Sequence, residues 1–101
     1  MAIYHITTQS AWQEARKTGQ YGTPSLETEG FVHCSTQTQV SGTAARYFKG
    51  QENLVLLVID ETQLQAPLRL ENTTGESEAY PHVYGPLNLD SIIEVRSFQV
   101  P

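Results

Sequence analysis

The longest apolar run in the sequence, Leu54 to Ile59, constrains the fold more than any other feature. Successive side chains of a β-strand point to opposite faces, so a strand that is apolar without alternation has two faces to bury. The run lies between the polar residues Asn53 and Asp60, which predicts a central, buried strand over residues 53–60. It is far shorter than the roughly 20 residues that a membrane-spanning helix needs, so we expect no membrane insertion.

Ahead of this run, the sequence predicts a strand followed by a helix. Ala2 to Thr7 is rich in Ile, Tyr and Thr, residue types that are favoured in strands. Ser10 and Gln13 have the spacing of a capping box, in which two side chains bond the free backbone N–H groups of a helix start. Gly19 is placed to end the helix, because glycine readily adopts the left-handed conformation that follows a helix. We therefore predict a first helix over Ser10 to Thr18.

A second strand and helix follow after a loop. Gln20 to Glu29 contains Gly, Pro and acidic residues, and a loop of this length is often functional. Phe31 to Ser35 predicts a second strand. From Gln37 to Lys49, apolar residues recur at helical spacing, which predicts an amphipathic helix closed by Gly50. Those apolar residues are Val40, Ala44, Tyr47 and Phe48.

After the central strand, the sequence predicts strands alone. Leu68 to Glu71 and Pro81 to Gly85 are short strand candidates, with Pro81 at a first position, where its missing N–H costs little. Asn72 to Ala79 is predicted as a polar loop, and Ser91 to Val100 as the last strand. The order β-α-β-α followed by strands predicts an α+β fold. A chain of 101 residues has the size of a compact single domain, here residues 1–101.

Composition narrows the range of partners. Eleven acidic and six basic residues give a formal net charge of -5, and the basic residues are scattered. Because duplex nucleic acid is bound through a basic surface, we expect no such partner. Cys34 is the single cysteine, which excludes an internal disulfide and a paired-cysteine metal knuckle. The start of the chain has no basic segment followed by a long apolar one, so we expect a reduced, cytoplasmic domain.

Three histidines, His5, His33 and His82, are the first candidates for chemistry, because the imidazole pKa lies near neutrality. Each lies in or beside a predicted strand. The period of two places Thr7 on the same face as His5, and Ser35 on the same face as His33. Neutral polar groups on one sheet face predict a cleft for a polar ligand. The alternative is that each histidine has a purely structural role.

Other chemistries have weaker support in the sequence. The three histidines lack the close spacing of a helical zinc motif, so we predict no metal. Cys34 neighbours His33, but adjacent strand residues point to opposite faces, which predicts a buried, inert thiol. Glu71 is the best placed carboxylate for a general base, because it ends an apolar-flanked strand. Tyr47 is equally consistent with a core position and with a stacking role. The candidates for stacking on a flat ligand ring are Tyr21, Tyr47, Tyr80 and Tyr84.

Taken together, these segments resemble a small bacterial family known as domain of unknown function 952 (DUF952). The most specific matches are Gly30-Phe-Val-His-Cys-Ser35 and Pro81-His-Val-Tyr-Gly85. The other matches extend the resemblance over nearly the whole chain: Ile3-Tyr-His-Ile-Thr7, Trp12, Ala15, Gly19, Gln39, Tyr47-Phe48, Leu56-Leu-Val-Ile-Asp60 and Glu71.

That family in turn resembles a minimal ADP-ribosyltransferase fold, which implies a split β-sheet. Tyr4-His5-Ile6-Thr7 is similar to the first motif of that fold, whose histidine bonds the ribose next to nicotinamide. Gly30 to Ser35, followed by Ser41, Ala44 and Tyr47, is similar to the second motif. There a strand and the following helix present a serine and an aromatic ring to the nicotinamide.

The third motif departs from the pattern of many active transferases. Glu78 to Tyr84 lies where the third-motif strand belongs, but Tyr80 or His82 takes the place of its glutamate. This departure is more similar to the histidine–histidine branch of the fold, which includes RNA 2′-phosphotransferases.

The resemblance implies NAD as the cofactor and the transfer or release of ADP-ribose as the activity. Such a reaction passes through an oxocarbenium-like state, which requires a fixed ribose and a stacked nicotinamide. The implied cofactor-binding residues are His5, Thr7, Ser35, Tyr47 and Tyr84. The implied catalytic residues are His5, His33 and His82, with His33 or His82 orienting or deprotonating the acceptor.

Two further interpretations are open at this point. In the first, the domain is a non-catalytic module that binds ADP-ribose or a nucleotide. In the second, it is a small scaffold in which the histidines are incidental. For the enzyme and for the binding module alike, the expected partner is a small-molecule nucleotide.

Overall fold

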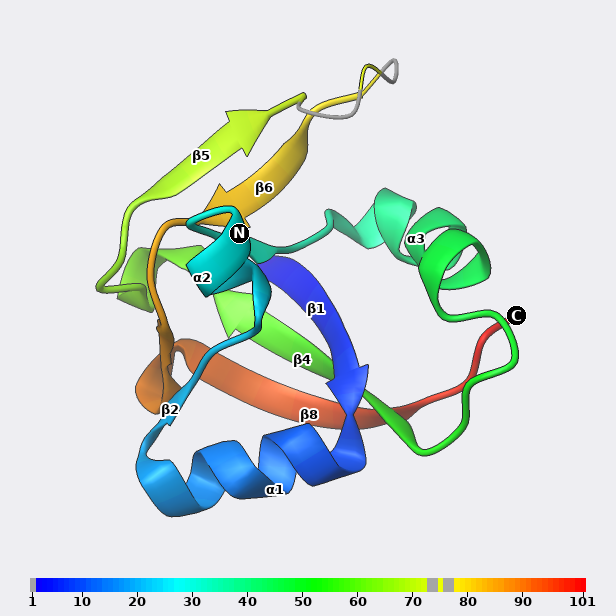
Figure 1. Cartoon of the computed structure of the whole chain (residues 1–101), viewed down its shortest axis with the longest axis horizontal. Coiled ribbons are helices and arrows are strands. Elements are labelled where there is room, and N and C mark those ends of the chain that lie inside the picture. Colours follow the sequence, from blue (N-terminus) through cyan, green and yellow to red (C-terminus); the bar gives the residue numbers. More distant parts are fainter. Residues whose placement is uncertain (1, 73–74, 76–77) are drawn as a thin grey trace.

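The apolar run forms the centre of a three-stranded antiparallel sheet in a computed structural model of the chain (Figure 1), which describes residues 2–72, 75 and 78–101. Within this sheet β4 pairs with β1 along one edge and with β8 along the other, and Leu57 and Ile59 are fully buried. The prediction of a central, buried strand is confirmed. The elements, in chain order, are β1 (Ala2–Thr8), α1 (Gln9–Thr18), β2 (Gln20–Tyr21), α2 (Ser25–Thr28), β3 (Val32–His33), η1 (Gln37–Gln39), α3 (Val40–Tyr47), β4 (Leu54–Asp60), η2 (Glu61–Gln63), β5 (Leu68–Glu71), β6 (Tyr80–Val83), β7 (Leu87–Asn88), η3 (Leu89–Ser91) and β8 (Ile92–Phe98), where η denotes a 3-10 turn.

The two faces of this sheet pack against different helices. Leu57 of β4 belongs to a hydrophobic cluster that includes Ala15 of α1. Leu56, its neighbour in the strand, belongs to a second cluster that includes Ala44 of α3. Because adjacent strand residues face opposite sides, both sides of β4 are removed from water. This double burial explains why the run contains no polar residue.

A second antiparallel sheet, with the strand order β3-β6-β5, meets the first at β1. Tyr4 in β1 and Ser35, two residues after β3, form an antiparallel bridge. The Tyr4 N–H donates to the Ser35 carbonyl at 2.8 Å, and the Ser35 N–H donates to the Tyr4 carbonyl at 2.7 Å. β2 and β7 form a separate pair. The chain is therefore a compact α+β domain with antiparallel sheets and a radius of gyration of 12.6 Å, close to the value expected for its length.

The first helix is capped by a different residue from the one predicted. Thr8 is the N-cap, and its side chain accepts a hydrogen bond from the Ala11 N–H at 3.1 Å. The helix therefore begins at Gln9, and the predicted capping box of Ser10 and Gln13 is wrong. Pairing with β4 holds Thr8 in an extended conformation, which is the backbone geometry that an N-cap requires. The predicted stop at Gly19 is confirmed, because Gly19 has a φ of 94°.

The second strand and helix are shorter than the sequence predicts. The predicted strand 31–35 is reduced to β3 because Pro81 of β6, which lies opposite Cys34, has no N–H to continue the ladder, and Ser35 then bridges to Tyr4. The predicted helix 37–49 is divided into η1 and α3, and a capping box at Thr36 and Gln39 begins it. The predicted loop 20–29 contains β2 and α2.

The later strands occur in the predicted order with shifted ends. β6 begins at Tyr80, so Pro81 is its second residue and not its first. The Pro81 carbonyl accepts from the Cys34 N–H at 2.9 Å. β8 ends at Phe98, before the predicted Val100. Residues 73, 74, 76 and 77 of the predicted polar loop lie outside the described residues. No helix in the described part of the chain has the length and apolar character of a membrane span.

Replacement of the cap tests this assignment. Thr8→Ala should lower the free energy of unfolding by about 1 kcal/mol, because the Ala11 N–H loses its side-chain acceptor. Ser10→Ala is the comparison variant, because Ser10 lies inside α1 and contacts the cap only through an exposed 3.3 Å hydrogen bond between its hydroxyl and Thr8 Oγ1. It should change this free energy by less than about 0.5 kcal/mol. Urea denaturation of the two variants measures both values. A larger loss from Ser10→Ala than from Thr8→Ala would show that the capping box at Ser10 is the real one.

Candidate ligand-binding cavity

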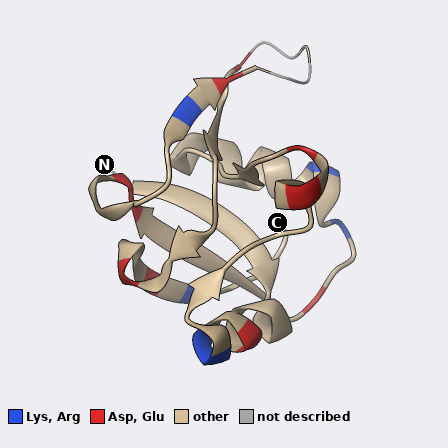
Figure 2. Ribbon diagram, turned by 60° about the vertical axis from the view of Figure 1, so that its left-hand side comes forward, with Lys and Arg blue, Asp and Glu red and all other residues tan. Residues whose placement is uncertain are grey.

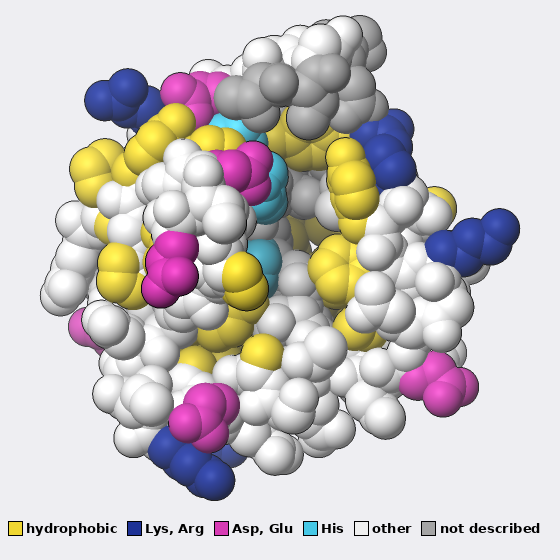
Figure 3. Space-filling model, viewed as in Figure 1, with side chains coloured by type: hydrophobic (Ala, Val, Ile, Leu, Met, Phe, Trp, Pro, Cys, Tyr) yellow, Lys and Arg dark blue, Asp and Glu magenta, His cyan; other side chains and the backbone are white. Residues whose placement is uncertain are grey.

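A cavity of about 630 Å³ opens where the two three-stranded sheets meet. Figure 3 shows the hollow, with histidine side chains along one wall and hydrophobic side chains around it. Its walls come mainly from β1, the segment 21–25, β3, α3 and β6. The volume lies within the roughly 300–1,000 Å³ of small-molecule sites.

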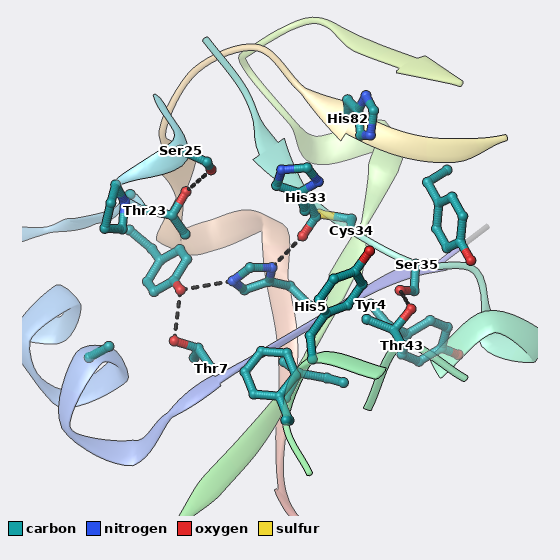
Figure 4. Close-up of a pocket in the computed structure, with 18 of the residues that line it drawn as sticks. Tyr4, His5, Thr7, Thr23, Ser25, His33, Cys34, Ser35, Thr43 and His82 are labelled. Carbon is teal, nitrogen blue, oxygen red and sulfur yellow. Dashed lines mark hydrogen bonds between the residues drawn. The ribbon is translucent and has the colours of Figure 1, made fainter. Parts of the chain in front are cut away.

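All three predicted histidines border this cavity. His33 and His82 are direct register partners in the β3–β6 ladder. The bridge between Tyr4 and Ser35 brings β1, and with it His5, beside the end of β3. Strand register therefore places together three side chains that are far apart in the sequence (Figure 4).

The other predicted site residues divide into two groups. Thr7, Ser35 and Tyr47 line the cavity. Tyr84 lies outside this lining, where its hydroxyl donates to the Glu71 carboxylate and the Arg69 guanidinium lies 5.3 Å from its ring centroid. This cavity therefore does not offer the direct contact between Tyr84 and a ligand that the resemblance implies.

Both ring nitrogens of His5 are used inside the protein. Nδ1 lies 2.6 Å from the His33 carbonyl oxygen, and Nε2 lies 2.8 Å from the Tyr21 hydroxyl. The Tyr21 hydroxyl lies 2.8 Å from Thr7 Oγ1 as well, so four residues form one chain of hydrogen bonds, drawn dashed in Figure 4. A carbonyl oxygen only accepts, which fixes the proton of His5 on Nδ1.

Burial keeps this network uncharged. Burial lowers the pKa of His5 to about 4, so the ring is neutral near pH 7. Burial likewise raises the pKa of the Tyr21 hydroxyl to about 12. His5 has no nitrogen available to a ligand while these bonds hold, and its role in the fold is to tie β1 to β2 and β3. The sequence predicts Tyr21 as a stacking residue. Its hydrogen bonds to His5 and Thr7 depend on how the fold places β2 next to β1.

Two carboxylates are paired with the remaining histidines. Glu29 Oε2 lies 2.9 Å from His33 Nε2, and both side chains are about half exposed (48% and 49%) at the mouth of the cavity. Glu71 Oε1 lies 3.0 Å from Nδ1 of the buried His82. The His82 ring also stacks on Phe31, with centroids 4.0 Å apart. Carboxylate–imidazole pairs are the arrangement that supports acid–base chemistry.

Hydroxyl groups complete the polar part of the lining. Ser35 Oγ and Thr43 Oγ1 lie 3.1 Å apart, and one hydroxyl proton is enough for the bond between them. Among the described residues these two hydroxyls make no other side-chain hydrogen bond, so the second proton can serve a ligand. Tyr47 is 58% exposed, which places its ring at the surface of α3 and not in the core.

The charge of the lining is weakly negative. Among the described residues that border the cavity, Glu29 is the one with a full charge, and none is Lys or Arg. Figure 2 shows basic and acidic residues spread over several elements and not gathered into one patch. Burial raises the pKa of the Cys34 thiol to about 12, so it stays protonated and is a poor nucleophile. The described residues contain no group of three His, Cys, Asp or Glu that would hold a metal ion.

Comparison with known proteins identifies the family. The chain belongs to the DUF952 family, described as a protein of unknown function, whose sequence profile matches residues 6–95. It is similar to the crystal structure of protein CC0527 from Caulobacter crescentus, with 32% identity and a TM-score of 0.88 over 98% of this chain and 87% of that chain. The solution NMR structure of CC0527 gives 32% identity and a TM-score of 0.84 over 97% of this chain and 84% of that chain. No curated protein matches the sequence.

The buried, neutral state of His5 predicts a dependence of stability on pH. The pKa of His5 is about 4 in the folded chain and about 6.5 when unfolded, so the unfolded state binds more protons between these values. The free energy of unfolding should therefore fall as the pH drops from 6.5 to 4, by about 3 kcal/mol through this group. Denaturation at several pH values should show that His5→Gln lacks this part of the decline. Parallel curves for the two proteins would contradict a neutral, buried His5.

Proposed function

We propose that the cavity binds the nicotinamide riboside part of NAD or of a related nucleotide. The observation that carries the proposal is the convergence of three histidines and several hydroxyl groups on one small-molecule-sized cavity. The segments that resemble the first two ADP-ribosyltransferase motifs supply Thr7, Ser35 and Tyr47 to that lining. Sequence resemblance and cavity position therefore support the same class of ligand.

The shape and polarity of the lining suit a nucleoside. A nucleoside combines a flat ring with a ribose that carries hydroxyl groups. The cavity offers aromatic rings, including Tyr4 and Tyr47, together with the hydroxyl pair of Ser35 and Thr43. Each neutral hydrogen bond to the ligand would contribute about 0.5–1.5 kcal/mol of binding free energy.

The charge of the lining favours a cationic ring over phosphate groups. The nicotinamide ring of oxidised NAD carries a positive charge, which the Glu29 carboxylate and tyrosine ring faces attract. Phosphate groups would be repelled by Glu29 and would meet no basic side chain among the described lining residues. We therefore place the pyrophosphate outside the cavity, in solvent.

Binding experiments with ligands that differ in the charge of the nicotinamide ring test this proposal. Isothermal titration should show that oxidised NAD and nicotinamide riboside bind, and that NADH and adenosine bind more weakly. Glu29→Gln should weaken binding of oxidised NAD by about two- to fivefold, as expected for a half-exposed charge. Glu94→Gln, on β8 and away from the cavity lining, is the matched control and should change nothing. Equal affinity for NADH and oxidised NAD, or no binding of either, would exclude the proposal.

A second candidate function is the release or transfer of ADP-ribose. The observation that favours it is the pairing of two cavity histidines with carboxylates, because such an imidazole can take a proton from an attacking hydroxyl or water. Since both nitrogens of His5 are engaged, this role would fall to His33 or His82.

Product analysis separates binding from turnover. On the second candidate, incubation with NAD should release nicotinamide, and His33→Gln or His82→Gln should reduce the rate by about 100-fold or more. Chromatography of the reaction mixture measures the released nicotinamide. Intact NAD after long incubation, together with binding in the titration, would leave the protein a binding module.

A further inference from the structure

We infer that Glu71 and Tyr84 position His82 so that its Nε2 faces the cavity as an unprotonated acceptor for a hydroxyl group of the ligand. The inference rests on the proposed function and deepens it. It gives roles to two residues outside the cavity lining and names the atom that recognises the ribose.

The contact with Glu71 determines which nitrogen of His82 carries the proton. His82 Nδ1 lies 3.0 Å from Glu71 Oε1. An ionised carboxylate only accepts hydrogen bonds, so Nδ1 must be the donor. Hydrogen bonds from Tyr84 and His82 hold the pKa of the Glu71 carboxyl below its usual value, which keeps it ionised. With its proton on Nδ1, the neutral form of the ring has its lone pair on Nε2.

The free nitrogen of His82 has access to the cavity. Nε2 has no hydrogen-bond partner among the described residues. No fully buried side-chain nitrogen or oxygen in the described part of the chain lacks a partner, so Nε2 must keep some contact with open space. His82 is 2% exposed, and the space that it borders is the cavity (Figure 4).

The His82 ring is held in this orientation from two sides. Phe31 stacks against the ring at an interplanar angle of 17°. The Glu71 carboxylate accepts from Tyr84 and His82 together, so it is restrained by two donors. Glu71 lies on β5, which is paired with the strand that carries His82. A rigid acceptor of this kind loses little entropy when a ligand hydroxyl donates to it.

Glu71 and Tyr84 are therefore positioning residues, and His82 is the one that touches the ligand. An unprotonated Nε2 accepts from O–H or N–H groups, and the ribose supplies O–H groups. A ligand that lacks the matching hydroxyl would leave Nε2 unpaired in the complex, which costs binding free energy. The Glu71–His82 pair should therefore discriminate ribosides from their deoxy analogues.

Nitrogen NMR of the histidine rings tests the positioning in the ligand-free protein. The ¹⁵N spectrum should show His82 protonated on Nδ1 and unprotonated on Nε2. Glu71→Gln should yield a mixture of the two forms, because an amide can either donate or accept. Glu94→Gln is the control and should leave the His82 signals unchanged. A wild-type protein with Nε2 protonated, or a Glu71→Gln variant with unaltered signals, would overturn the inference.

Addition of nicotinamide riboside tests the acceptor role. The His82 Nε2 signal should shift on binding, and the 2′- or 3′-deoxy analogue should bind about tenfold more weakly. That discrimination should be smaller in Glu71→Gln, because only part of the population then has an unprotonated Nε2. Binding without a shift at Nε2, or without discrimination, would overturn the inference and leave the proposed function standing. Absence of binding would overturn the proposed function, and the ligand-free spectra would still decide whether Glu71 positions His82.

Discussion

The unequal use of the two edges of β1 determines the rest of this structure. One edge pairs along its full length with β4. The other edge makes the bridge between Tyr4 and Ser35, and the second sheet diverges from there. The His5 side chain strengthens this junction by bonding the His33 carbonyl and Tyr21. The cavity lies at this junction, and residues on both sides of the bridge line it.

The junction divides the three histidines between structural and chemical roles. His5 is closest to the bridge, and its burial keeps it neutral and fully bonded. His33 and His82 lie farther along the second sheet, and each is paired with a carboxylate. His5, the histidine of the first motif in the family resemblance, is therefore the one whose hydrogen bonds hold the strands together. The proposed ligand recognition falls to side chains that the same hydrogen bonds place around the cavity.

Local patterns in the sequence predict the parts of the fold that depend on local chemistry. The apolar run predicts β4, and Gly19 predicts the end of α1, because burial and backbone conformation are properties of single elements. The cap at Thr8, the short β3 and the network of Tyr21 depend on strand pairing between distant segments, which no local pattern encodes. The resemblance names Thr7 and Ser35 as ligand-binding residues, and both line the cavity. It does not predict the outward position of Tyr84, which depends on the carboxylate supplied by β5.

The central claim is that the junction of the two sheets forms a binding site for the nicotinamide riboside group. Intermolecular nuclear Overhauser effects between the nicotinamide ring protons of oxidised NAD and the protein test it most directly. The account predicts contacts with the side chains of Ser35, Thr43 and Tyr47 around the cavity. Contacts confined to another surface, such as the exposed strand β8, would contradict it.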